Sequence, residues 1–111
     1  MATLTKQTGI RDGLEATYAS AAGGGDEFVN TGREFIHIKN ASGGDITLTI
    51  VTQQTVDAEA VGDKTVIITL AEERFVGPFP KTVYSDSNEK VQLTYSGVTS
   101  LTIAILELTQ L

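Results

Sequence analysis

The clearest structural signal in the chain is "DITLTIVT", residues 45–52. Ile46, Leu48 and Ile50 alternate there with threonine and valine. Successive side chains of a strand point to opposite faces of the sheet, so a period of two places the three apolar residues on one face. The stretch therefore predicts a strand with one face buried in a core.

Three more stretches alternate in the same way: "EFIHIKN" at 34–40, "KTVIITL" at 64–70 and "KVQLTYS" at 90–96. They are rich in β-branched residues, which pack well on a pleated surface. We therefore interpret each as a strand. The predicted inward positions are Ile36, Ile38, Val66, Ile68, Leu70, Val91, Leu93 and Tyr95.

The last stretch, "TSLTIAILELTQL" at 99–111, is apolar on both faces. Its spacing also fits a helix, but threonine and isoleucine dominate and no helix cap precedes it, which favours a strand. A strand that is apolar on both faces is either central in a sandwich or covered by another subunit. One face carries Leu101, Ile103 and Ile105, and the other carries the candidate subunit-interface residues Ala104, Leu106 and Leu108.

Turn-forming residues separate these stretches. "KNASGGD" at 39–45 and "SDSNE" at 85–89 combine Asn, Asp, Ser and Gly, and we interpret both as hairpin loops. "YSGVTS" at 95–100 predicts a tighter turn that makes the last two strands antiparallel neighbours. Together the pattern predicts an all-β fold, an antiparallel β-sandwich, jelly-roll-like or a small barrel, of about eight strands.

Both prolines lie in "ERFVGPFPKTVY", residues 73–84. Proline cannot donate to a sheet ladder, so this segment predicts a crossover between sheets, with Phe75 and Phe79 in the core. The alternative is a proline-rich ligand for a partner's groove, but the proline spacing of such motifs is missing.

The N-terminal residues form a distinct segment. Residues 1–25 mix threonine-rich extended stretches with three consecutive glycines, which are unfavourable inside a regular element. We predict an extended arm and flexible joint at 1–25 and a β-sandwich domain at 26–111. The arm is either a frayed terminus or a segment that becomes ordered on a neighbouring subunit. In the second case its contacts are Leu4 and Ile10 as apolar anchors and Lys6 and Arg11 as polar clamps.

Composition excludes several classes of protein. The chain has 111 residues, the length of one domain, and no cysteine, so neither a disulfide nor a thiolate metal site can form. Its net charge of −6 disfavours a nucleic-acid partner. We expect no membrane association, because no apolar stretch reaches the length that crosses a bilayer, and we expect synthesis in the cytoplasm.

The residue patterns of catalysis and cofactor binding are missing. The one histidine, His37, lies between isoleucines, and Ser42 lies in a glycine loop without a nucleophile-elbow motif. We interpret His37 as an ordinary strand residue and predict neither enzymatic activity nor a cofactor. Acidic loops could form a weak calcium site, but without EF-hand spacing we interpret them as solvated. These acidic residues are Asp57, Glu59, Asp63, Asp86 and Glu89.

Several segments together resemble a known group of proteins. They are "LTKQTGIRDGL", "AGGGDEFVNTGREFIHIKN", "GGDITLTI", "RFVGPFP" and "VQLTYSGVTSLTIAIL". The chain is similar along most of its length to small structural proteins of tailed bacteriophage heads, which are similar to capsid decoration (cement) proteins. The resemblance is weakest at residues 53–64. It rests on turn and strand signatures and assigns no functional residue.

The resemblance implies a protein that binds the major capsid protein on the outer surface of the virion and associates with itself, with a trimer favoured. One alternative is another virion component of the neck, tail or fibre attachment. The other is a carbohydrate- or calcium-binding module, which would need converging loop carboxylates or an exposed tyrosine cluster. The tyrosines available are Tyr18, Tyr84 and Tyr95.

Overall fold

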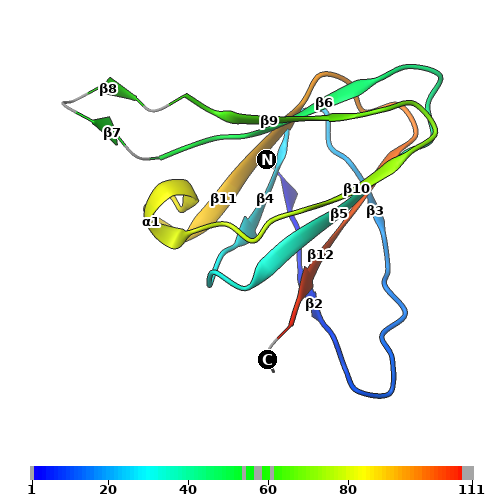
Figure 1. The fold of residues 1–111 in the computed structure, drawn as a ribbon, viewed down its shortest axis with the longest axis horizontal. Coiled ribbons are helices and arrows are strands. Elements are labelled where there is room, and N and C mark those ends of the chain that lie inside the picture. The colour runs from blue at the N-terminus through cyan, green and yellow to red at the C-terminus, as the bar shows by residue number, and fades with distance from the viewer. Residues whose placement is uncertain (1, 54, 57–58, 61, 109–111) are drawn as a thin grey trace.

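The computed structural model describes residues 2–53, 55–56, 59–60 and 62–108, and they form two β-sheets packed against each other (Figure 1). The first sheet consists, in order across it, of β1 (Ala2–Thr3), β4 (Asp26–Val29), β11 (Lys90–Tyr95), β6 (Ile46–Ile50) and β9 (Lys64–Ile68). The second consists of β10 (Glu73–Val76), β5 (Glu34–Asn40), β12 (Leu101–Glu107) and β2 (Lys6–Thr8), with β3 (Ala19–Ser20) also paired to β12.

The remaining elements are small. β7 (Thr55–Val56) and β8 (Glu59–Ala60) pair with each other, and α1 (Lys81–Tyr84) is a single turn. Most strand pairs are antiparallel, but β1–β4 and β2–β12 are parallel. The prediction of a β-sandwich is confirmed. No helix among the described residues approaches the length that crosses a bilayer.

The core lies between the sheets, and the alternating pattern predicts most of it. Each sheet contributes side chains that are fully or almost fully buried, at every second position of its strands. They include Phe28, Leu48, Ile50, Ile68, Val91 and Leu93 from the first sheet, and Ile36, Ile38, Leu101, Ile103 and Ile105 from the second. Val66 and Tyr95 are partly buried against this core.

The predicted core position of Leu70 is wrong. Leu70 is 48% exposed, because β9 ends at Ile68 and the chain then turns. Ala71 adopts a left-handed backbone conformation in this turn, with φ of 61°. The alternation read from the sequence continues past the point at which the strand leaves the sheet.

The last stretch of the chain is a strand, as predicted, and it is central in the second sheet. β12 pairs with β5 along its whole length, from Leu101 opposite Asn40 to Glu107 opposite Glu34. Its other edge is shared between β2 and β3. The central position explains why both faces are apolar, which was one of the two expected alternatives.

The predicted hairpins at two turns are wrong. β5 and β6, which flank residues 41–45, lie in different sheets, and so do β11 and β12, which flank residues 96–100. The first corner is held by Asn40, whose side-chain amide donates to the carbonyls of Gly44 and Ile68, at 2.8 and 3.0 Å. Turn-forming residues allow the chain to reverse, but they do not determine whether it returns to the same sheet.

Residues 77–80 cross from the second sheet to the first, as predicted for the proline segment. Phe79 is buried and packs against Phe28, with ring centroids 6.1 Å apart. Phe75 was predicted in the core but is 65% exposed, because the register of β10 pairs it with His37 on the outer face. Gly77 has φ of 129°, and a Cβ there would lie 3.0 Å from the Phe35 backbone, so glycine is required.

The N-terminal segment joins both sheets of its own chain. β1 pairs with β4 in the first sheet and β2 pairs with β12 in the second (Figure 1). Leu4, between these strands, packs against the core. The described residues 2–25 consist of β1, β2 and β3 and the loops between them. The contact of this segment with a neighbouring subunit stays a prediction.

Candidate interaction surfaces

The β2–β3 loop, residues 9–18, projects from the end of the second sheet (Figure 1). Ile10 and Leu14 are 59% and 40% exposed, and Arg11 between them is also exposed. Gly13 donates its amide hydrogen to the carbonyl of Ile10 at 3.0 Å and adopts a positive φ of 99°, which shapes the tip. The loop therefore presents two large apolar side chains and a cation to solvent.

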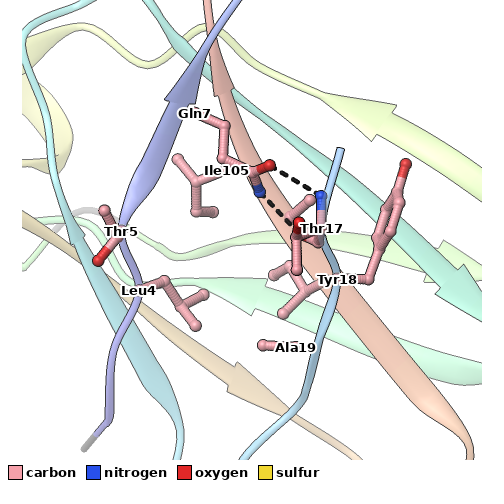
Figure 2. Close-up of a pocket in the computed structure, with 9 residues that line it drawn as sticks. Leu4, Thr5, Gln7, Thr17, Tyr18, Ala19 and Ile105 are labelled. Carbon is pink, nitrogen blue, oxygen red and sulfur yellow. Dashed lines mark hydrogen bonds between the residues drawn. The ribbon is translucent and has the colours of Figure 1, made fainter. Parts of the chain in front are cut away.

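The base of this loop is closed by hydrogen bonds. The side-chain amide of Gln7 donates to the Thr17 carbonyl at 2.7 Å and accepts from the Thr17 amide nitrogen at 2.8 Å (Figure 2). Gly9 donates to the carbonyl of Glu107 at 2.8 Å. Both ends of the loop are thus tied to the sandwich.

The four predicted arm contacts divide into two pairs. Ile10 and Arg11 are exposed in the β2–β3 loop. Leu4 and Lys6 contact their own chain, Leu4 in the core and Lys6 against two buried carboxylates. Leu14 was missed from the sequence, although it lies four residues after Ile10 in the same glycine-bounded segment.

Lys6, Glu34 and Glu107 form an acid–lysine cluster at one end of the sandwich. The Lys6 Nζ lies 2.7 Å from Glu107 Oε2 and 3.1 Å from Glu34 Oε2. Both carboxylates are buried, and they accept further hydrogen bonds from Thr31 and Thr8. The cluster joins the N-terminal strand β2 to β5 and β12.

Hydrogen bonding favours the charged forms of Lys6 and Glu34. The bonds to Glu107 and Glu34 raise the pKa of Lys6 above its ordinary value. Burial alone would raise the pKa of Glu34, but hydrogen bonds from the backbone and hydroxyl of Thr31 and from Lys6 outweigh burial and lower this pKa to about 2. The folded state therefore favours the ionised form of Glu34 more than the unfolded state does.

Acid is expected to destabilise the protein through Glu34. The pKa of Glu34 is about 2 in the folded state and 4.5 ordinarily. The stabilisation of the folded state by ionised Glu34 is therefore complete above about pH 4.5 and is lost as the pH falls toward 2. The expected loss is about 3 kcal/mol at most. Urea unfolding at several pH values between 7 and 2 measures it. Glu34→Gln should show a shallower acid dependence than the wild-type chain, and an unchanged dependence would contradict this assignment.

The outer face of the second sheet carries the predicted interface residues of β12. Ala104 is buried, Leu106 is half-buried and Leu108 is 53% exposed. The strand register places Leu106 opposite Phe35 of β5. The ring centroids of Phe35 and Phe75 lie 6.2 Å apart. Phe75 was not predicted on this surface. An apolar stripe therefore crosses β10, β5 and β12 on this face.

His37 lies beneath the exposed ring of Phe75. The two rings are stacked with centroids 4.1 Å apart and planes inclined by 10°. The Tyr18 hydroxyl lies 2.5 Å from His37 Nδ1, and Glu73 Oε1 lies 3.0 Å from His37 Nε2. Lys39 places its Nζ 3.9 Å from the centroid of the Tyr18 ring. His37 thus organises a polar and aromatic network, which its sequence position between isoleucines did not indicate.

A pocket of about 340 Å³ lies where β2 and the segment before β3 diverge (Figure 2). The described residues that line it carry no charged side chain. The lining residues are Leu4, Thr5, Gln7, Thr17, Tyr18, Ala19, Ile103, Ala104 and Ile105.

The acidic residues considered for calcium binding do not converge where they are described. Among the described residues no group of three or more histidine or acidic side chains is placed to hold a metal ion. Asp57 and the side chain of Glu59 lie outside the described residues. The hydroxyl of Tyr95 donates to buried Asp26 at 2.6 Å, and burial, together with this bond, raises the pKa of Tyr95. Tyr95 is therefore held within its own chain.

Comparison of the chain with protein-family models, with curated proteins and with solved structures finds no significant match.

Proposed function

We propose that the protein is a non-enzymatic structural component of a bacteriophage virion, a decoration protein that binds the major capsid protein on the outside of the head. The proposal starts from the resemblance of the sequence segments to small head proteins. One structural observation supports it: the β2–β3 loop holds two exposed apolar side chains on a base that is tied to the sandwich.

This loop suits adhesion for a physical reason. A few side chains that fill pockets of the partner contribute most of the binding energy of an interface. Because Gln7 and Thr17 close the base, less chain entropy is lost when the tip becomes ordered on a partner. A protein that binds the assembled lattice better than the free subunits stabilises the shell by mass action. The net charge of −6 suits display away from packaged DNA.

Undecorated heads provide the test. Purified protein is expected to co-sediment with them and to raise their melting temperature. Ile10→Asp combined with Leu14→Asp should weaken binding by about tenfold or more, because two apolar anchors are replaced by charges. Ile67→Asp combined with Leu70→Asp is the matched control, since these residues are also exposed but lie on the first sheet and its following turn.

The outcomes separate the function from the loop assignment. If the wild-type protein neither binds heads nor changes their melting, the decoration function is wrong. If the loop variant binds as tightly as the control variant, the function stands and the loop is not the contact. Labelled protein found at the neck or tail by microscopy would retain the virion role and contradict the location on the head.

A further inference from the structure

The outer face of the second sheet carries an exposed aromatic ring beside a hollow. Phe75 is 65% exposed, the highest exposed fraction among the exposed large apolar side chains of the described residues. The hollow has a volume of about 230 Å³, far more than the roughly 10–15 Å³ that one water needs. Gly32, Arg33, Phe35, Pro78 and Leu108 line it.

The structure holds Phe75 in place from below. Its ring is stacked on His37 and lies beside Phe35, while Tyr18 and Glu73 hydrogen-bond to the two ring nitrogens of His37. A ring fixed in this way loses little conformational freedom when a partner covers it, and such preorganised aromatic side chains contribute most to association. Phe75 therefore has the properties of an anchor.

The anchor and the hollow are neighbours on one face. Phe35 contacts the Phe75 ring and also lines the hollow, which is completed by Leu108 just after β12 and Pro78 after β10. An apolar hollow open to solvent matches an apolar side chain rather than a polar ligand. The side chain that the same surface offers is Phe75.

The charged side chains beside the Phe75 anchor and beside the hollow have opposite signs. Glu73 lies two residues before Phe75 on the same face of β10, with its side chain 55% exposed, whereas Arg33 lies at the hollow. If Phe75 of one copy enters the hollow of another, we expect Glu73 of the first copy to come near Arg33 of the second, in addition to the contacts that these side chains make within their own chain. In a chain of net charge −6, most contacts between copies bring like charges together, so this pairing favours one particular contact.

We infer that two copies of this chain bind face to face through the outer faces of their second sheets, with Phe75 of each inserted into the hollow of the other. Because the anchor and the hollow lie on the same surface, a twofold axis satisfies both at once. This pairing does not require binding to heads, and it is separate from the threefold association that the resemblance implies.

Association measured by analytical ultracentrifugation over a range of concentrations tests the inference. The wild-type chain should form dimers, and Phe75→Ser should raise the dissociation constant by about 100-fold, as for loss of a central aromatic anchor. Ile67→Ser is the matched control, since Ile67 is 59% exposed on the first sheet, and it should leave the constant unchanged. Circular dichroism confirms that each variant is folded.

A charge exchange tests the geometry independently of the ring. Glu73→Arg should weaken the dimer, and Glu73→Arg combined with Arg33→Glu should restore it toward the wild-type constant. A wild-type chain that stays monomeric at every concentration overturns the inference. It is also overturned if Phe75→Ser dimerises like Ile67→Ser, or if the double exchange associates no better than Glu73→Arg alone.

Discussion

Ile103→Asp is expected to abolish folding of the isolated chain. Ile103 is 1% exposed and lies on the inner face of β12, opposite Ile38. The substitution removes buried apolar surface, a loss of about 2–5 kcal/mol for a large-to-small change at such a site. It also buries a carboxyl group that has no partner, which adds several kcal/mol more. The sum reaches the total stability of about 5–15 kcal/mol that is typical of a domain.

Far-ultraviolet circular dichroism and thermal unfolding measure this effect. Thr102→Asp is the matched control, because Thr102 is the neighbouring residue of the same strand and its side chain is half-buried on the opposite face, in register with Lys39. The control should keep a cooperative transition close to that of the wild-type chain. A cooperative transition of Ile103→Asp at the wild-type temperature would show that the inner face of β12 is assigned incorrectly.

Lys6→Met is expected to be the next most damaging change, with a loss of about 3–5 kcal/mol in the free energy of unfolding at neutral pH. Methionine preserves most of the length of the side chain but leaves Glu34 and Glu107 as two buried carboxylates without their cation. Like charges that share a buried site raise the pKa of at least one of the pair. The variant should therefore become more stable as the pH falls from 7 toward 5, whereas the wild-type chain should not.

Urea unfolding at pH 7 and pH 5 distinguishes this loss from a simple loss of packing. Lys81→Met is the control, because the Lys81 Nζ lies 3.8 Å from Glu89 and both side chains are about half exposed or more. An exposed pair of this kind contributes about 0–1 kcal/mol. Lys6→Met combined with Glu34→Gln and Glu107→Gln should recover part of the stability. If Lys6→Met were no more damaging than Lys81→Met, the acid–lysine cluster would have no stabilising role.

The sequence patterns located most strands and much of the core. Alternation identified β5, β6, β9, β11 and β12, and it failed at Leu70, where burial depends on where the strand ends. The interpretation of the proline segment failed at Phe75, where burial depends on which face of β10 is covered. The residues of the candidate interaction surfaces were predicted less well from the sequence. Ile10 and Arg11 are exposed, and their contact with a neighbouring subunit stays a prediction. Lys6 was also predicted as a clamp on a neighbour, because its partners in its own chain are 28 and 101 residues away and no local pattern reveals them.

The sequence alone determined the all-β class and the inward face of most strands, because side chains alternate along any extended backbone and that alternation is visible in a single strand. The three-dimensional structure was needed to show that β5 and β6 lie in different sheets, as do β11 and β12, and that Phe75 faces outward above His37. Strand pairing and side-chain contact depend on residues distant in the chain, and a local pattern carries no information about which distant partner packs best.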